Sequence, residues 1–194
     1  GFNYSFGCKG AGKAQDMVEL GRKYGFETHV VSEVQMDGRP VSSTRIRGEI
    51  AKGDLEEAAR LLGRPYALCG VVEHGKKVGR RLDFPTANLC WPKKKAIPPR
   101  GVYAAMAYVR DEWYRAAVNI GSHPTAPGGN AITVEANLID YEGGEFYGCH
   151  MRLAIFKQLR EEKKFESLEA LREAVMENRE QTKAYFDALL QDGE

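Results

Sequence analysis

Two apolar stretches stand almost side by side in the sequence: Gly101–Val109 (GVYAAMAYV) and Glu112–Ile120 (EWYRAAVNI), with only Arg110 and Asp111 between them. Short runs of this kind, bounded by glycine, proline or charged residues, predict β-strands. Three more runs share the pattern, namely Tyr66–Glu73, Thr133–Tyr141 and His150–Phe156. Several short strands at this spacing predict an antiparallel β-barrel or sandwich, so the chain is expected to be mainly β.

The residues upstream of these strands predict a short α/β piece. A helix is predicted at Ala14–Tyr24, because Gly25 follows it in the position where glycine commonly ends helices. A short strand is predicted at Phe26–Val31. After a turn, the small hydroxylated residues of Val41–Arg47 predict the start of a second helix, which should end near Gly53.

A domain boundary is predicted just after a third helix. Asp54 starts that helix in a capping-box-like pair with Glu57, and the next glycine ends it. Arg64–Pro65 follows as the predicted boundary. We therefore expect the α/β piece to occupy residues 1–63 and the β-domain to occupy residues 64–194.

The C-terminal residues predict a helix that packs against the β-domain. Ser167 is a suitable N-cap, and apolar residues recur after it on a helical period. A polar stretch at residues 178–182 interrupts this apolar pattern. The apolar positions are Leu168, Leu171, Val175, Phe186 and Leu189.

Composition excludes several broad classes of protein. The chain has 194 residues, and its 28 basic and 27 acidic side chains give a net charge of +1. Such balance predicts neither general nucleic-acid binding nor attraction to membranes. No apolar run approaches the roughly 20 residues that cross a bilayer. We expect a soluble, cytoplasmic protein.

The four cysteines, Cys8, Cys69, Cys90 and Cys149, are far apart and form no Cys-x-x-Cys pair, and the four histidines have no ligand spacing. A structural zinc site is therefore not expected. With no secretory leader and enough residues for a core, we expect the thiols to be reduced.

The segment Gly75–Leu89 (GKKVGRRLDFPTANL) has residues suited to phosphate and magnesium. Glycine lets backbone N–H groups approach phosphate, Lys and Arg neutralise its charge, and the Thr86 hydroxyl and Asn88 carbonyl are hard oxygen ligands for Mg²⁺. By composition alone, an ordinary basic hairpin turn leading into a strand is the favoured interpretation of this segment, because a motif match by itself is a weak signal. It is not a Walker loop, because the Gly-x-x-x-x-Gly-Lys-Ser/Thr spacing is missing.

This segment resembles the signature of the riboflavin kinase family, whose Pro-Thr-Ala-Asn element stands here at Pro85–Asn88. The resemblance covers Arg64 to Phe186. It implies a six-stranded antiparallel Greek-key barrel with a C-terminal helix, and ATP and riboflavin on two sides of a site built from loops. Further matches follow in the family's order: Gly101–Tyr103, Asn119–Gly121, His123–Thr125, Val134–Glu135, Tyr147–Gly148 and Leu159–Leu168.

The resemblance also implies roles for individual residues on the nucleotide side. Thr86 and Asn88 would hold Mg²⁺ and the ATP phosphates, and Gly75 and Arg80 would belong to the loop over those phosphates. The residues implied to lie near the nucleotide are Leu138, Asp140 and Tyr147.

For catalysis and flavin binding, the resemblance implies four residues. Glu135 would be the general base for the ribityl 5′-hydroxyl. Arg160, Lys163 and Phe165 would hold the flavin through hydrogen bonds and an aromatic contact. Without the resemblance, Glu135 is a solvent-facing residue of an alternating strand and the other three belong to a solvated charged linker.

Three positions depart from the family pattern. Asp83 stands where glycine is usual, Ala126 where an aromatic commonly follows, and Asn137 where histidine is frequent. An acidic side chain at Asp83 would either repel phosphate or help to arrange Mg²⁺, whereas neither Ala126 nor Asn137 removes a group that the chemistry needs.

The first residues resemble part of another module. Ser42–Arg47 resembles the phosphate-binding segment of the FMN adenylyltransferase module of bifunctional bacterial FAD synthetases, and Gly1–Gly7 resembles an earlier element of it. Hydroxyls and N–H groups at a helix start suit phosphate, although a plain helix cap explains them equally. The residues concerned are Ser42, Ser43, Thr44, Arg45 and Arg47.

Residues 1–63 therefore resemble a C-terminal remnant of the nucleotidyltransferase, and no adenylyl transfer is expected of this chain. The leading hypothesis is a Mg²⁺-dependent riboflavin kinase with the small-molecule substrates ATP and riboflavin. A non-catalytic flavin-binding barrel or riboflavin sensor is the alternative.

Overall fold

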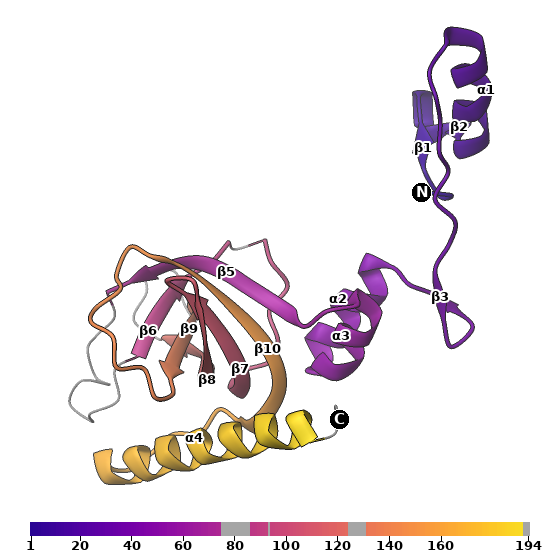
Figure 1. Cartoon of the computed structure of the whole chain (residues 1–194). Coiled ribbons are helices and arrows are strands. Elements are labelled where there is room, and N and C mark those ends of the chain that lie inside the picture. Colours follow the sequence, from indigo (N-terminus) through magenta and orange to yellow (C-terminus); the bar gives the residue numbers. More distant parts are fainter. Residues whose placement is uncertain (75–85, 93, 124–130, 192–194) are drawn as a thin grey trace. The chain divides into compact units, whose positions relative to one another are not determined.

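The computed structural model describes residues 1–74, 86–92, 94–123 and 131–191 (Figure 1). The chain divides into two compact units, Gly1–Ser43 and Thr44–Glu194. Each unit is described by itself.

The first unit consists of small elements around one helix. Strands β1 (Ser5–Phe6) and β2 (Gly12–Lys13) pair antiparallel around the 3-10 turn η1 (Cys8–Gly10), and β3 (Gln35–Met36) pairs with β4 (Arg39–Pro40).

Helix α1 spans Ala14–Tyr24 and ends at Gly25 in the left-handed conformation, φ +78°, as the sequence predicts. The strand predicted at Phe26–Val31 is wrong. Val31 accepts one main-chain hydrogen bond, from Phe2, but no strand among the described residues pairs with this segment. An apolar segment forms a β-strand only where a neighbouring strand accepts and donates its backbone hydrogen bonds.

Two helices begin the second unit and join the core of the barrel. Helix α2 (Ser43–Lys52) leads into α3 (Leu55–Leu62), whose N-cap Asp54 accepts a hydrogen bond from the Glu57 N–H at 3.0 Å. Leu55 is 1% exposed and packs with barrel residues, as do Ile50 and Ala58. The compact unit thus starts upstream of the domain boundary that the sequence predicts after residue 63, and that module boundary stays a prediction.

Six antiparallel strands close into a barrel in the order β10-β5-β6-β9-β8-β7. This Greek-key order confirms the predicted mainly β fold. Two strands, β5 and β7, have the predicted bounds. The bounds are β5 Tyr66–Glu73, β6 Thr86–Cys90, β7 Gly101–Val109, β8 Glu112–His123, β9 Ala131–Leu138 and β10 His150–Glu161.

Small and aliphatic side chains fill the interior of the barrel. A barrel of few strands is only wide enough inside for side chains, so it becomes a packed core. Tyr103 is the largest fully buried side chain, and its hydroxyl donates to the Pro99 carbonyl at 2.5 Å. Other inward residues are Leu68, Val72, Ala87, Ala105, Ala116, Val118, Val134, Ala136 and Leu153.

Helix α4 (Leu168–Gln191) runs along the outside of the barrel and contacts β7, β8 and β10 (Figure 1). Ser167 caps it, accepting a hydrogen bond from the Ala170 N–H at 3.1 Å. The polar stretch 178–182 does not interrupt the packing. Asn178 is 5% exposed and Thr182 is fully buried, so both lie on the covered face.

The predicted apolar face is only partly covered. Phe186 is buried against Phe156, with ring centroids 5.0 Å apart, whereas Leu168 and Leu189 are exposed.

Candidate active site

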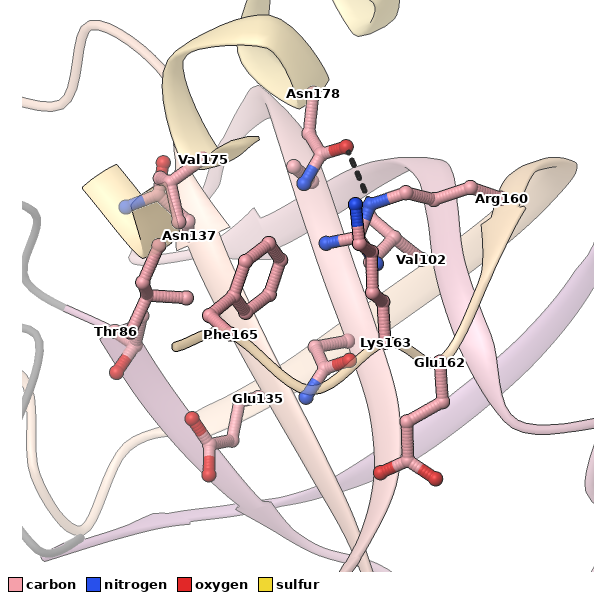
Figure 2. A pocket seen from close by; sticks show the side chains of 13 residues that line it. Thr86, Val102, Glu135, Asn137, Arg160, Glu162, Lys163, Phe165, Val175 and Asn178 are labelled. Atoms are coloured by element: carbon pink, nitrogen blue, oxygen red, sulfur yellow. Dashed lines mark hydrogen bonds between the residues drawn. The ribbon is translucent and has the colours of Figure 1, made fainter. Parts of the chain in front are cut away.

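Two cavities lie beside the strands of the barrel, and Thr86 lines both. The first, of about 240 Å³, lies between the strands, the segment after β10, and α4 (Figure 2). The second, of about 300 Å³, lies beside the segment after β9. The start of β6 is therefore the place where the two cavities meet.

Strand register brings the predicted catalytic residues together. Thr86 pairs with Asn137, and Asn88 pairs with Glu135, across β6 and β9. Directly paired residues project to the same face with Cβ atoms about 5 Å apart. Glu135 in turn pairs with Asn119 across β9 and β8. The carboxylate thus stands beside the predicted oxygen ligands, on the outer face.

The predicted flavin residues form the opposite wall of the first cavity. In Figure 2 the Phe165 ring lies between Thr86 on one side and Arg160 on the other, with the Glu135 carboxylate below it. The Arg160 guanidinium carbon lies 5.5 Å from the Phe165 ring centroid, and the Lys163 ammonium lies 5.9 Å from it. An aromatic face and two cations therefore line the same opening.

Arg160 is held by two hydrogen bonds. Its Nε donates to Asn178 Oδ1 at 3.1 Å, and one terminal nitrogen donates to the Glu161 carbonyl at 3.0 Å. Burial lowers the pKa of Arg160, while the charge of Glu177 acts in the opposite direction. An arginine with such a shift still carries its charge at neutral pH.

Glu162 also lines the first cavity, and sequence reasoning gave it no role. Its carboxylate accepts from the Ser122 N–H at 3.3 Å. A Cβ at Gly121 would lie only 2.8 Å from Glu162 Oε1, so only glycine fits without a shift. The Asn-Ile-Gly segment at residues 119–121 was the available signal. Other lining residues without a predicted role are Val102, Ala117, Asn119, Leu171, Val175 and Asn178.

The second cavity has aromatic and glycine-rich walls. Of the residues predicted to lie near the nucleotide, Leu138 and Tyr147 line it. The His74 ring packs on Tyr147, with centroids 3.7 Å apart. Arg110 holds the segment between Leu138 and Tyr147. It donates hydrogen bonds to the Glu145 carbonyl at 2.7 Å and to the Tyr141 hydroxyl at 3.4 Å.

Asp140 lines neither cavity. Its carboxylate is paired instead with Arg179 at 3.4 Å and with Lys183 at 3.5 Å, both from α4. Its implied place near the nucleotide stays a prediction. Gly75, Arg80 and the departures at Asp83 and Ala126 lie outside the described residues.

The predicted phosphate-binding segment, residues 42–47, spans the boundary between the two units. Ser42 and Ser43 belong to the first unit, and Thr44, Arg45 and Arg47 belong to the second. Arg45 pairs with Glu57 of α3 at 3.0 Å, and its side chain is only 10% exposed. A hydrogen bond from Arg60 lowers the pKa of Glu57, and the charge of Arg45 acts in the same direction. Arg45 thus ties α2 to α3.

The donor set suits a hard cation more than zinc. Among the described residues, no group of three or more His, Cys, Asp or Glu side chains could hold a metal. The four cysteines, all among the described residues, form no disulfide bond. A threonine hydroxyl and an asparagine carbonyl two residues apart on one strand face are oxygen donors, as Mg²⁺ prefers when phosphates supply its other ligands.

Two family models match the chain. The model for riboflavin kinase matches residues 62–186, and the model for FAD synthetase matches residues 1–45. The first match contains all of the barrel and both cavities. The second covers the first unit.

Curated relatives are similar over most of this chain but are longer. A bifunctional riboflavin kinase/FMN adenylyltransferase of Listeria monocytogenes is 37% identical over 97% of this chain and 60% of its own length. One of Pseudomonas fluorescens is 36% identical over 90% of this chain and 56% of its own. The chain therefore spans somewhat more than half the length of these relatives.

A solved structure shares the fold. A crystal structure of a macrolide-efflux protein from Streptococcus pneumoniae has a TM-score of 0.78 and 31% identity, covering 94% of this chain and 58% of that one. In the described part of the present chain, no helix has the length and apolar character needed to cross a membrane.

Proposed function

This chain belongs to the riboflavin kinase family, and on that premise we propose that it transfers the γ-phosphate of ATP to the 5′-hydroxyl of riboflavin, giving FMN and ADP. The observation that carries the proposal is the pairing of Asn88 with Glu135 beside Thr86. A base and phosphate ligands meet there, where two cavities of different chemistry join.

The two cavities suit the two substrates. In the first, the Phe165 ring offers an apolar face to the isoalloxazine, and Arg160 and Lys163 offer hydrogen-bond donors to its oxygens. In the second, Tyr147 and Leu138 offer an aromatic and apolar surface to the adenine nucleotide. Thr86 lies at the junction, where the γ-phosphate would face the ribityl chain.

Glu135 is the proposed general base. Its carboxylate accepts the proton of the 5′-hydroxyl as that oxygen bonds to the γ-phosphorus. The bond from this phosphorus to the β,γ-bridging oxygen breaks, and ADP leaves with the electron pair. Phosphoryl transfer depends chiefly on such positioning and on charge stabilisation.

Magnesium is the proposed cofactor. Thr86 and Asn88 would hold it, and the ion would neutralise charge on the ATP phosphates. The protein's own contribution is to hold both oxygen donors of β6 on the same sheet face as Glu135 of the neighbouring strand β9.

The experiment is an assay for FMN and ADP from riboflavin, ATP and Mg²⁺. We expect Glu135→Gln to lower kcat by about 10³-fold, within the range of general-base contributions. Glu173→Gln, an exposed position of α4, is the matched control and should keep wild-type turnover. Undiminished turnover of Glu135→Gln would exclude this carboxylate as the base.

A non-catalytic flavin-binding barrel or riboflavin sensor is the second candidate, because the first cavity has the side chains to bind a flavin without help from the second. It requires riboflavin binding without ATP consumption. Chromatography of the same reaction would then show unchanged ATP. With FMN in place of riboflavin, we expect no FAD, because the first unit buries only Ala14 and Gly21 and so has no packed core to hold a second nucleotide site.

A further inference from the structure

Adjacent residues of α4 each hold a polar side chain of the first cavity. Asn178 accepts from Arg160 Nε at 3.1 Å, and Arg179 donates to Asn137 Oδ1 at 2.8 Å. Arg160 comes from β10 and Asn137 from β9, so the two contacts reach different walls of the cavity. Sequence reasoning gave neither α4 residue a role.

The hydrogen bond between Asn178 and Arg160 orients a side chain of the first cavity only. Asn178 is 5% exposed, and its amide oxygen sets the plane of a guanidinium that faces the Phe165 ring (Figure 2). A hydrogen bond to a charged group is stronger than one between neutral groups, and losing it in a buried place is costly. Without this acceptor, Arg160 would lose its orientation toward the flavin side.

The Arg179 contacts reach both cavities. One terminal nitrogen donates to Asn137 Oδ1 and, at 3.4 Å, to the Leu138 carbonyl; the other donates to Asp140 Oδ1 at 3.4 Å. Asn137 lines the first cavity and Leu138 the second. Arg179 therefore holds the end of β9 at the point where this strand passes from one cavity to the other.

We propose that Asn178 and Arg179 are positioning residues with different reach: Asn178 sets Arg160 for the flavin alone, whereas Arg179 sets the end of β9 for flavin and nucleotide together. The inference rests on the proposed riboflavin kinase function. It predicts that a change at Asn178 alters the KM for riboflavin but not the KM for ATP, which a merely structural role of α4 would not produce.

Asn178→Leu tests the first half, because leucine has a similar size but no acceptor. We expect the KM for riboflavin to rise about tenfold, the loss of one buried charged hydrogen bond, with the KM for ATP unchanged. Asn178→Asp keeps an acceptor oxygen and should restore most of the riboflavin affinity. Equal changes in both constants, or no difference between leucine and aspartate, would overturn this half.

Arg179→Ala tests the second half. We expect both Michaelis constants to rise, each by about tenfold, and Arg179→Lys, which keeps the charge but not the several directed donors, to recover only part of the loss. Arg172→Ala removes an exposed cation from the same helix and is the matched control. A change confined to one substrate, or the same change in Arg172→Ala, contradicts the proposal.

Two further measurements show whether a variant has lost the positioning of its site or has lost its fold. Riboflavin binding followed by flavin fluorescence, and the melting temperature of each variant, distinguish lost positioning from lost folding. If the wild-type chain forms no FMN, the proposed function fails. If it forms FMN and the α4 variants keep wild-type constants, only this inference fails.

Discussion

The two units of the chain differ in what they do with their apolar side chains. In the second unit Leu55, Leu68 and Tyr103 are 0–1% exposed and belong to one core with the barrel strands. In the first unit, large apolar residues lie at the surface, with exposed fractions from 42% at Val30 to 67% at Val31. Burial of apolar surface is the main favourable term in folding. The second unit therefore has the core that independent stability requires, and no residue of the first unit lines either described cavity.

The largest expected effect comes from removing a core side chain of the barrel. Leu68→Ala should lower the free energy of unfolding by about 2–5 kcal/mol, the usual cost of truncating a buried leucine. Tyr24→Ala, at a residue 66% exposed in the first unit, should change it by no more than about 0.5 kcal/mol. Urea denaturation of both variants measures the difference. Equal losses would show that the first unit contributes as much to stability as the core of the barrel.

High pH should loosen the barrel through a buried tyrosine. Burial raises the pKa of Tyr103 to about 12. Since the unfolded side chain has a pKa near 10, the folded state keeps its proton longer, and this stabilisation is present below about pH 10 and lost as pH rises toward about 12. Urea denaturation across that window should show a fall in stability that Tyr103→Phe reduces. An equally steep fall in that variant would mean that Tyr103 is not the cause.

A smaller effect is expected from the cap of α3. Asp54→Ala should lower the stability of the barrel by about 1 kcal/mol, because α3 is part of its core. Asp16 accepts a hydrogen bond from the Lys13 N–H at the start of α1, so Asp16→Ala is the matched change in the first unit. Asp16→Ala should leave the free energy of unfolding of the barrel, measured by urea denaturation, unaltered. If Asp54→Ala also leaves it unaltered, α3 is not part of the barrel's cooperative unit.

Sequence predicted elements well where the signal is local. Gly25 ends α1 and Asp54 caps α3 through contacts within a few residues. The strand expected at Phe26–Val31 failed because a strand needs a partner, which no local pattern supplies. The short β6 was not among the strands inferred from periodicity, since Thr86–Cys90 has too few residues to show one.

The candidate site depends on contacts that are distant in sequence. Alternation alone makes Glu135 an ordinary surface residue, and only the register of β6 with β9 places it beside Asn88. The sequence places Asn178 in a polar interruption of the C-terminal helix. It is buried because Arg160 of β10 provides a partner for its amide.

The most direct test of the account is the kinase assay on residues 41–194, which keep α2, the barrel and α4 without the greater part of the first unit. The account predicts FMN formation within about twofold of the whole chain, because both described cavities belong to the second unit. A folded fragment that forms no FMN from riboflavin, ATP and Mg²⁺, while the whole chain does, would contradict it.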